Sequence, residues 1–263
     1  MNDDQRIAAC RTSVSQIYHM LNHAPQTWRN YVDLARSVIV HVDATTYMQR
    51  PSDVSEQAWM IGGLQQLAFL DSDRNLVDDI AAWCSRQWLA LLERDRHNVA
   101  ALRGIGQSWL VRAQPVLSRI HHLEGSSSSS GDSSSRSAGS GSGSALNQNT
   151  ADEVTTNATA DEAERRINTQ EYVEARQYLQ PATEYLNRAV AAATTQEALS
   201  GDLLATVSTA EAFMSLGNVS SPRNNERHFH RALRLLRAAA ATPDYSLNRY
   251  LQQYLDDYGR LLD

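Results

Sequence analysis

Apolar residues recur at steps of three and four along two long stretches of this 263-residue chain, and no other feature constrains the fold as strongly. Two such series are Ile7, Cys10, Val14, Ile17 and Leu21, and Tyr172, Ala175, Leu179, Ala182, Leu186, Ala189 and Ala193. Residues with this spacing lie on one face of an α-helix. The alternating pattern and hairpin turns of β-strands are missing from the sequence. We therefore expect an all-α fold of roughly nine or ten helices joined mostly by short turns, which favour antiparallel neighbours.

Clusters of turn-forming residues mark the expected helix ends. They are Asn22 to Pro25, Arg50 to Asp53, Asp71 to Asp73, Arg96 to Asn98, and Thr242 to Asp244. Pro181 lies inside a helical pattern, so a kink or a new helix is expected there. The last helix is expected over Tyr245 to Leu262, with tyrosines on a broad face and polar residues opposite, as suits a capping helix.

A Ser/Gly-rich stretch separates the two helical blocks. From Gly125 to about Asn149 it contains too few apolar side chains to offset the entropy lost on ordering. We predict a helical block over 1–123, a disordered linker over 124–159, and a second helical block over 160–263. The linker is either a tolerated surface loop or, because its serines are dense, a platform for phosphorylation.

Charge and composition exclude several classes of function. The net charge is −6, which gives no bias towards nucleic acid or anionic membranes, and no apolar run reaches the length of about 18 residues that a membrane span needs. All 24 basic residues are Arg, so neither a lysine Schiff base nor a P-loop is possible. The missing Lys reflects either an Arg-favouring genome or avoidance of ubiquitin and acetyl transfer. The N-terminus lacks a signal-peptide pattern, so we expect a cytoplasmic or nuclear protein.

Side chains that could carry catalysis or bind metal do not occur in a productive pattern. His121 and His122 are adjacent, and His228 and His230 are two residues apart, so each pair diverges on a helix. Cys84 lies in an apolar run, which favours a buried thiol over a nucleophile. We therefore predict no catalytic residue, no metal site and no cofactor.

Five arginines form a basic face on the helix expected near 223–241. At about 100° per residue they fall within an arc of about 120°. They are Arg223, Arg227, Arg231, Arg234 and Arg237. This basic face is either solvated or binds an acidic partner or a phosphate, because guanidinium groups bind both bidentately.

Residues 88–113 contain a repeat-like pattern. One helix ends in Leu-Leu-Glu-Arg-Asp, a tight turn ends at Asn98, and the next helix carries Leu102, Ile105, Gly106 and Trp109. Gly106 would let two paired helices approach closely. This pattern resembles the first helix of a tetratricopeptide (TPR) repeat, although Arg96 replaces the proline usual in the preceding turn. Weaker copies are Ala210, Phe213 and Gly217 followed by Ala232, Ala239 and Pro243, and the pair Trp59 and Gly63.

The TPR resemblance implies antiparallel helix hairpins stacked as a short right-handed solenoid with a concave face. Carried onto this sequence, the concave positions are Ala100, Arg103, Gln107 and Leu110, with Arg103 and Gln107 placed to grip a peptide carboxylate or backbone. The implied function is a non-enzymatic protein–protein interaction adaptor that presents a groove to a partner peptide or helix. An irregular helical bundle is the alternative fold. The alternative functions are a regulatory or structural subunit of a larger complex, linked to ubiquitin-dependent turnover by the missing lysines, and an α-helical enzyme.

Overall fold

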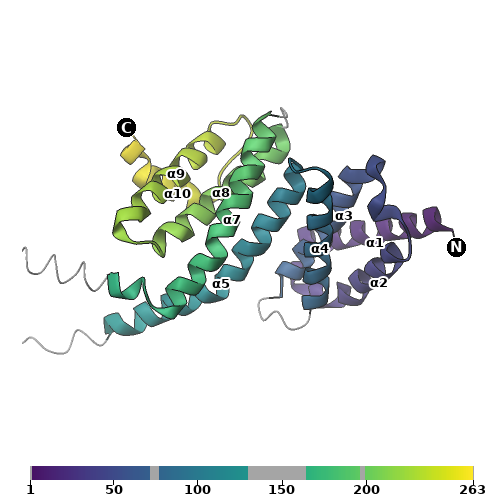
Figure 1. Cartoon of the computed structure of the whole chain (residues 1–263), viewed down its shortest axis with the longest axis horizontal. Coiled ribbons are helices and arrows are strands. Elements are labelled where there is room, and N and C mark those ends of the chain that lie inside the picture. The colour runs from purple at the N-terminus through teal and green to yellow at the C-terminus, as the bar shows by residue number, and fades with distance from the viewer. Residues whose placement is uncertain (1, 72–76, 130–163, 196–198, 263) are drawn as a thin grey trace, which may run out of the picture. The chain divides into compact units, whose positions relative to one another are not determined.

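The structure, a computed structural model, describes residues 2–71, 77–129, 164–195 and 199–262 (Figure 1). These ranges contain α-helices and short 3₁₀ helices and no strand, which confirms the all-α class for them. The α-helices are α1 (Asp3–His23), α2 (Val32–Asp43), α3 (Val54–Phe69), α4 (Asp78–Arg94), α5 (Val99–Ser129), α7 (Gln170–Thr195), α8 (Leu199–Asn218), α9 (Pro222–Ala240) and α10 (Arg249–Tyr258). The 3₁₀ helices are Pro25–Tyr31, Tyr47–Gln49, Pro51–Asp53 and Gly259–Leu262.

Side chains at the helix ends explain why the expected breaks occur. α1 ends at His23, just before the Pro25 at which a 3₁₀ helix begins. Between α4 and α5, the Asp95 carboxylate accepts from the His97 backbone N–H at 2.9 Å, and Asn98 Oδ1 accepts from the Ala101 N–H at 2.9 Å. The Asn98 side chain therefore caps the first turn of α5. The predicted tight turn ending at Asn98 is confirmed.

Two prolines lie inside long helices. α7 continues through Pro181, so of the two expected outcomes, a kink or a new helix, the new helix does not occur; α5 likewise contains Pro115. Proline removes one backbone donor, so the carbonyl of Gln177 loses its helical partner. The residues on either side still form helix because α7 presents buried Leu179, Ala182 and Leu186 to its neighbours.

α5 extends beyond the predicted boundary of the first block. It reaches Ser129, whereas the linker was predicted to begin at 124. From residue 130 onwards the predicted linker lies outside the described residues. Thirty-one residues of continuous helix therefore begin at Val99 and enter the Ser-rich stretch.

The final helix is shorter than its apolar pattern predicts. α10 begins at Arg249 and not near Tyr245. The backbone of Asp244, just before the predicted start, has a φ of 61°, in the left-handed region, so the chain turns there. Asn248 then caps α10, since its Oδ1 accepts from the Leu251 N–H at 2.9 Å.

The chain forms two compact units. The first contains Met1–Ser108 and Tyr185–Ala205, and the second contains Trp109–Glu184 and Thr206–Asp263. The boundaries fall inside α5, α7 and α8, so these units do not follow the division predicted at the Ser/Gly-rich linker. Each of the three helices contributes one part of its length to each unit.

In the first unit, α3 packs against α1 and α4, and α1 also packs against α2. The core between them contains large buried side chains, and the Trp83 indole N–H donates to Asp43 Oδ1 at 2.9 Å. Tyr47, which is fully buried, donates its hydroxyl to Glu56, and Glu56 is also paired with Arg11 of α1. Polar groups at the edge of this core are therefore hydrogen-bonded, as burial requires.

In the second unit, α5 and α7 are antiparallel (Figure 1). Trp109 and Tyr178 have ring centroids 6.2 Å apart, Arg119 pairs with Glu174 at 2.7 Å, and Glu124 accepts from the Tyr172 hydroxyl. As residue numbers increase along α5, the numbers of the contacting residues on α7 decrease, as expected for antiparallel helices. α9 packs against α10, and the Arg237 guanidinium donates to the Gly259 carbonyl at 2.8 Å.

The three glycines in the repeat-like patterns each lie against a side chain of another helix. A Cβ on Gly106 would lie 2.6 Å from Leu186 Cγ and 3.1 Å from the Leu186 backbone N. A Cβ on Gly217 would lie 2.7 Å from Phe229, and one on Gly63 would lie 2.8 Å from Tyr18. The close approach predicted at Gly106 is therefore confirmed. For Gly106 and Gly217 the contacting helix comes later in the chain than the glycine, whereas for Gly63 it comes earlier.

Candidate binding pocket

A cavity of about 360 Å³ in the first unit brings together residues from α1, α3, α4, α5 and the start of α8. We call it the α3–α5 pocket. Its apolar walls come mainly from Trp59, Trp88 and Leu204, and its polar groups include Arg103, Gln66 and Gln107. The full set of lining residues is Tyr18, Ser55, Ala58, Trp59, Gly62, Gln65, Gln66, Trp88, Ala100, Arg103, Gly104, Gln107 and Leu204.

Three of the four positions that the TPR resemblance assigned to a concave face line the α3–α5 pocket, namely Ala100, Arg103 and Gln107. Arg103 and Gln107 are one helical turn apart and therefore share a face. Leu110 does not line it. Leu110 is buried, with 8% of its surface exposed, and belongs to the second compact unit, so it offers little surface to a partner.

Arg103 supplies the positive charge of the pocket. Burial lowers the pKa of its guanidinium, and the nearby Tyr18 hydroxyl partly offsets this effect. Arginine nevertheless stays protonated at physiological pH. No Asp or Glu occurs among the described residues that line the pocket. A guanidinium that lines a cavity can bind an anionic group of a ligand bidentately.

Tyr18 and Trp59 form one aromatic wall. Their rings are stacked with centroids 5.4 Å apart, and the Tyr18 hydroxyl donates to the Trp59 backbone carbonyl at 3.0 Å. Gly63, one turn further along α3, leaves room for the Tyr18 ring, because a Cβ there would lie 2.8 Å from a ring carbon. The missing side chain at Gly63 therefore allows the ring to pack against α3.

A buried hydrogen-bond network holds the base of the pocket. Gln65 Nε2 donates to the Gly104 carbonyl at 2.7 Å and to Ser108 Oγ at 2.6 Å. Its Oε1 accepts from the Trp88 indole N–H at 2.9 Å. A Cβ on Gly104 would overlap the Trp88 ring, so only glycine lets the indole lie flat against α5. The network links α3, α4 and α5 and limits movement of the wall that Trp88 forms.

Sequence patterns missed the aromatic wall and Gln65. Trp59 was identified only as part of a weak repeat, and Gln65 lies in a helix whose apolar pattern gives it no special place. The periodicity of one helix carries no information about which other helix faces it. The two adjacent glycines of α3 are the one local signal of a close neighbour.

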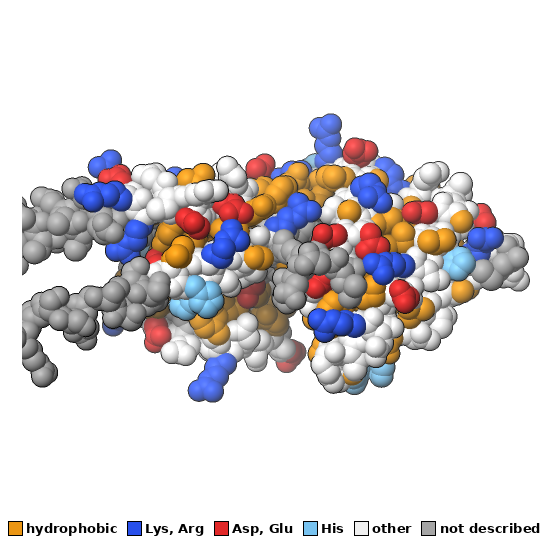
Figure 2. All heavy atoms as spheres, turned by 90° about the horizontal axis from the view of Figure 1, so that it is seen from below, with side chains coloured by type: hydrophobic (Ala, Val, Ile, Leu, Met, Phe, Trp, Pro, Cys, Tyr) orange, Lys and Arg blue, Asp and Glu red, His pale blue; other side chains and the backbone are white. Residues whose placement is uncertain are grey.

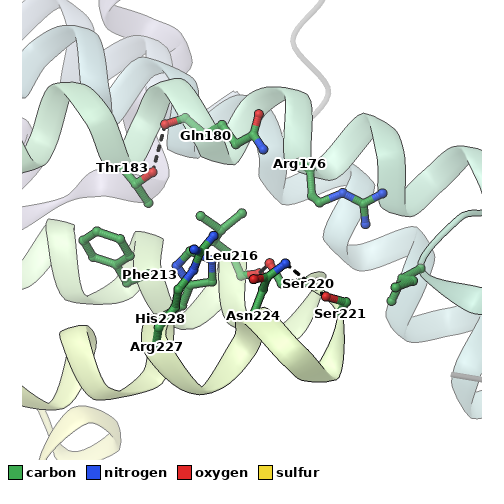
Figure 3. Close-up of a pocket in the computed structure, with 11 residues that line it drawn as sticks. Arg176, Gln180, Thr183, Phe213, Leu216, Ser220, Ser221, Asn224, Arg227 and His228 are labelled. Carbon is green, nitrogen blue, oxygen red and sulfur yellow. Dashed lines mark hydrogen bonds between the residues drawn. The ribbon is translucent and has the colours of Figure 1, made fainter. Parts of the chain in front are cut away.

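The predicted basic face lies on α9, and all five of its arginines are exposed. Arg227 lines a second cavity, of about 490 Å³, in the second unit (Figure 3). Arg237 contacts the Gly259 carbonyl, as described above. The five arginines therefore share one face but do not share one site. Figure 2 shows a face of the protein on which acidic and basic side chains are interspersed.

Two other kinds of site do not occur within the described residues. None of their helices is both long and apolar enough to cross a membrane. Within the same ranges, no cluster of three or more His, Cys, Asp or Glu residues has the geometry to hold a metal ion.

Comparisons of the chain with protein-family models, with curated proteins and with solved structures found no match.

Proposed function

We propose that this protein is a TPR-like interaction adaptor of the cytoplasm or nucleus, whose α3–α5 pocket binds a partner peptide or helix through an anionic group and an apolar side chain. The observation that carries the proposal is the convergence of Arg103 and Gln107 with Trp59 and Leu204 in one cavity. An arginine and an amide bind a carboxylate or a peptide backbone, and aromatic walls hold an apolar side chain.

Features of the walls favour binding over catalysis. The titratable side chains of the α3–α5 pocket are Arg103 and Tyr18, and burial raises the pKa of Tyr18. Neither is a suitable general base near neutral pH. Leu204, with 49% of its surface exposed, offers an apolar contact at the rim. Such a mixture of an anchor, an amide and apolar surface is typical of peptide-recognition sites.

The helix pairs support the TPR-like part of the proposal. The glycines at the repeat-like positions lie where a residue of another helix packs against them, and short turns join α4 to α5 and α8 to α9. In this reading α5 and α7 are the two helices of one pair, with the Ser/Gly-rich stretch inserted between them. A right-handed solenoid stays a prediction.

Selection from a library of random peptides tests the pocket. Enriched peptides are expected to share a carboxylate, at the C-terminus or on a side chain, next to a large apolar residue. Arg103→Gln should weaken their binding by about tenfold or more, since hydrogen bonds to charged groups contribute about 1.5–3 kcal/mol. Affinities can be measured by calorimetry with purified peptide.

Arg86→Gln is the matched control, because Arg86 is an exposed arginine on α4 that does not line the pocket. Its affinity for the selected peptides should equal that of the unmodified protein. Equal binding by the Arg103 variant, or no enrichment over background, would reject the proposed site.

A further inference from the structure

The second cavity lies between three helices of the second unit and is separate from the α3–α5 pocket. We call it the α7–α9 cavity. It measures about 490 Å³, within the range of small-molecule sites. Figure 3 shows Arg176 and Gln180 on α7, across the cavity from Asn224, Arg227 and His228 on α9. Its lining residues are Ile167, Arg176, Gln180, Thr183, Phe213, Leu216, Ser220, Ser221, Asn224, Arg227 and His228.

Two guanidinium groups from different helices give this cavity a positive character. Arg176 lies on α7 and Arg227 on α9, and no Asp or Glu occurs among the described residues that line the cavity. Both positive charges line one cavity without a lining carboxylate, so an anion bound in the cavity is attracted by both.

Arg176 is held in place by the backbone. Its Nη1 donates to the Val219 carbonyl at 2.7 Å, in the turn between α8 and α9. A guanidinium has five N–H donors in a rigid fork, so this one bond orients the group and leaves others to face the cavity. The contact also fixes the turn that carries Ser220 and Ser221.

His228 contributes a third group that can become cationic. Its ring stacks on Phe213 with centroids 6.0 Å apart, which sets its orientation. Burial and the charge of Arg227 lower its pKa, so in the free protein the neutral form is favoured. The charged side chains that line the cavity with it are Arg176 from α7 and Arg227 from α9, while α8 contributes Phe213, Leu216 and Ser220.

Small polar groups complete one end of the cavity. α9 begins there at Pro222, and the Ser221 hydroxyl makes no capping bond to the helix backbone. Asn224 Nδ2 donates to Ser221 Oγ at 3.2 Å, and Ser220 Oγ donates to the Leu216 carbonyl at 2.6 Å. The positive end of the helix dipole adds to the field of the two arginines.

We propose that the α7–α9 cavity binds a phosphate monoester, with Arg176 and Arg227 gripping its phosphoryl oxygens. Arginine forks match phosphate geometry bidentately, and a dianion satisfies two guanidinium groups better than a single carboxylate does. The remaining volume, bounded by Gln180, Thr183 and the Phe213 ring, accommodates the group esterified to the phosphate. The same chemistry could be presented by a free small molecule or by a phosphorylated side chain.

Calorimetric titration of the full chain tests this site with four probes: sulfate, inorganic phosphate, O-phospho-L-serine and a pentapeptide with a central phosphoserine. We expect saturable binding of the phosphate esters that Arg227→Gln weakens by about tenfold or more. Arg234→Gln is the matched control, because Arg234 is exposed on the same helix outside the cavity, and it should change affinity by less than about twofold.

Two results would overturn the phosphate site. One is the lack of saturation by any probe, and the other is equal weakening by Arg227→Gln and Arg234→Gln. Arg176→Gln, checked for folding by circular dichroism because it loses the Val219 contact, should weaken binding as Arg227→Gln does. Tighter binding of the pentapeptide than of phosphoserine identifies a phosphorylated protein as the source, and the reverse order identifies a small molecule.

Sulfate isolates the role of His228, because it stays a dianion across the range in which histidine titrates. The affinity of the α7–α9 cavity for sulfate is expected to increase as the pH falls from about 7.5 to about 5.5, because protonation of His228 adds a third positive charge to the cavity wall. His228→Asn should remove this increase. A pH dependence that persists in His228→Asn would overturn the assignment of this residue to the site.

Discussion

Replacing Trp88 by alanine is expected to lower the free energy of unfolding by about 4 kcal/mol. The indole is buried, with 2% of its surface exposed, and lies flat against Gly104 of α5. Its removal leaves a cavity between α3, α4 and α5, and it also leaves Gln65 Oε1 without the N–H that it accepts from.

Chemical denaturation followed by circular dichroism measures this loss without relying on tryptophan fluorescence. Trp88→Phe separates the two contributions, because it keeps most of the ring but removes the donor, and it should cost about 1–3 kcal/mol. Leu89→Ala is the neighbouring control, since Leu89 has 47% of its surface exposed, and it should change stability by no more than about 0.5 kcal/mol. A loss in Trp88→Ala as small as that in Leu89→Ala would show that the indole is not packed as described.

Gly106→Ala is expected to destabilise the protein by about 1–3 kcal/mol, and Gly106→Leu by more. The new Cβ would lie too close to Leu186, and the Leu186 backbone N at 3.1 Å prevents a simple change of rotamer from relieving the clash. α5 and α7 must therefore move apart at this crossing, which loses packing in the core formed by Leu102, Ala189 and Ala192.

Gly62→Ala is the matched control for this crossing. Both glycines lie inside helices, so both changes gain about 1 kcal/mol of helix propensity. A Cβ on Gly62 would contact only the Tyr18 hydroxyl, at 3.1 Å, which is the far end of a side chain. Gly62→Ala should therefore be close to neutral in a denaturation experiment. Equal stability of the two variants would contradict a close α5–α7 crossing.

Much of the local structure could be predicted from the sequence. Apolar residues spaced by three and four positions identify helices, because this spacing places them on one buried face. The turn at Asn98 could be predicted because its side chain caps the next helix. Gly106 was identified because a small residue in an apolar stripe indicates a close neighbour. Ala100, Arg103 and Gln107 share a face by spacing alone, and the α3–α5 pocket contains all three.

Features that depend on distant parts of the chain could not be predicted in the same way. Leu110 continues the face of Arg103, but it is buried, because burial is decided by the neighbouring helices and not by position on one helix. Pro181 was expected to kink the helix or to begin a new one. No new helix begins there, because tertiary packing of the surrounding residues outweighs the loss of one hydrogen bond. The division into units that cuts α5 and α7 likewise follows from packing between segments far apart in sequence.

The five tryptophans provide the most direct measurement of whether the α3–α5 pocket is the binding site. Each indole N–H gives its own signal in a ¹⁵N-edited NMR spectrum. During titration with a selected peptide, the signals of Trp59 and Trp88 should shift, because these two indoles line the pocket, while those of Trp28 and Trp83 stay fixed in the core. Shifts at Trp28 or Trp83 with Trp59 and Trp88 unmoved would contradict binding at this site.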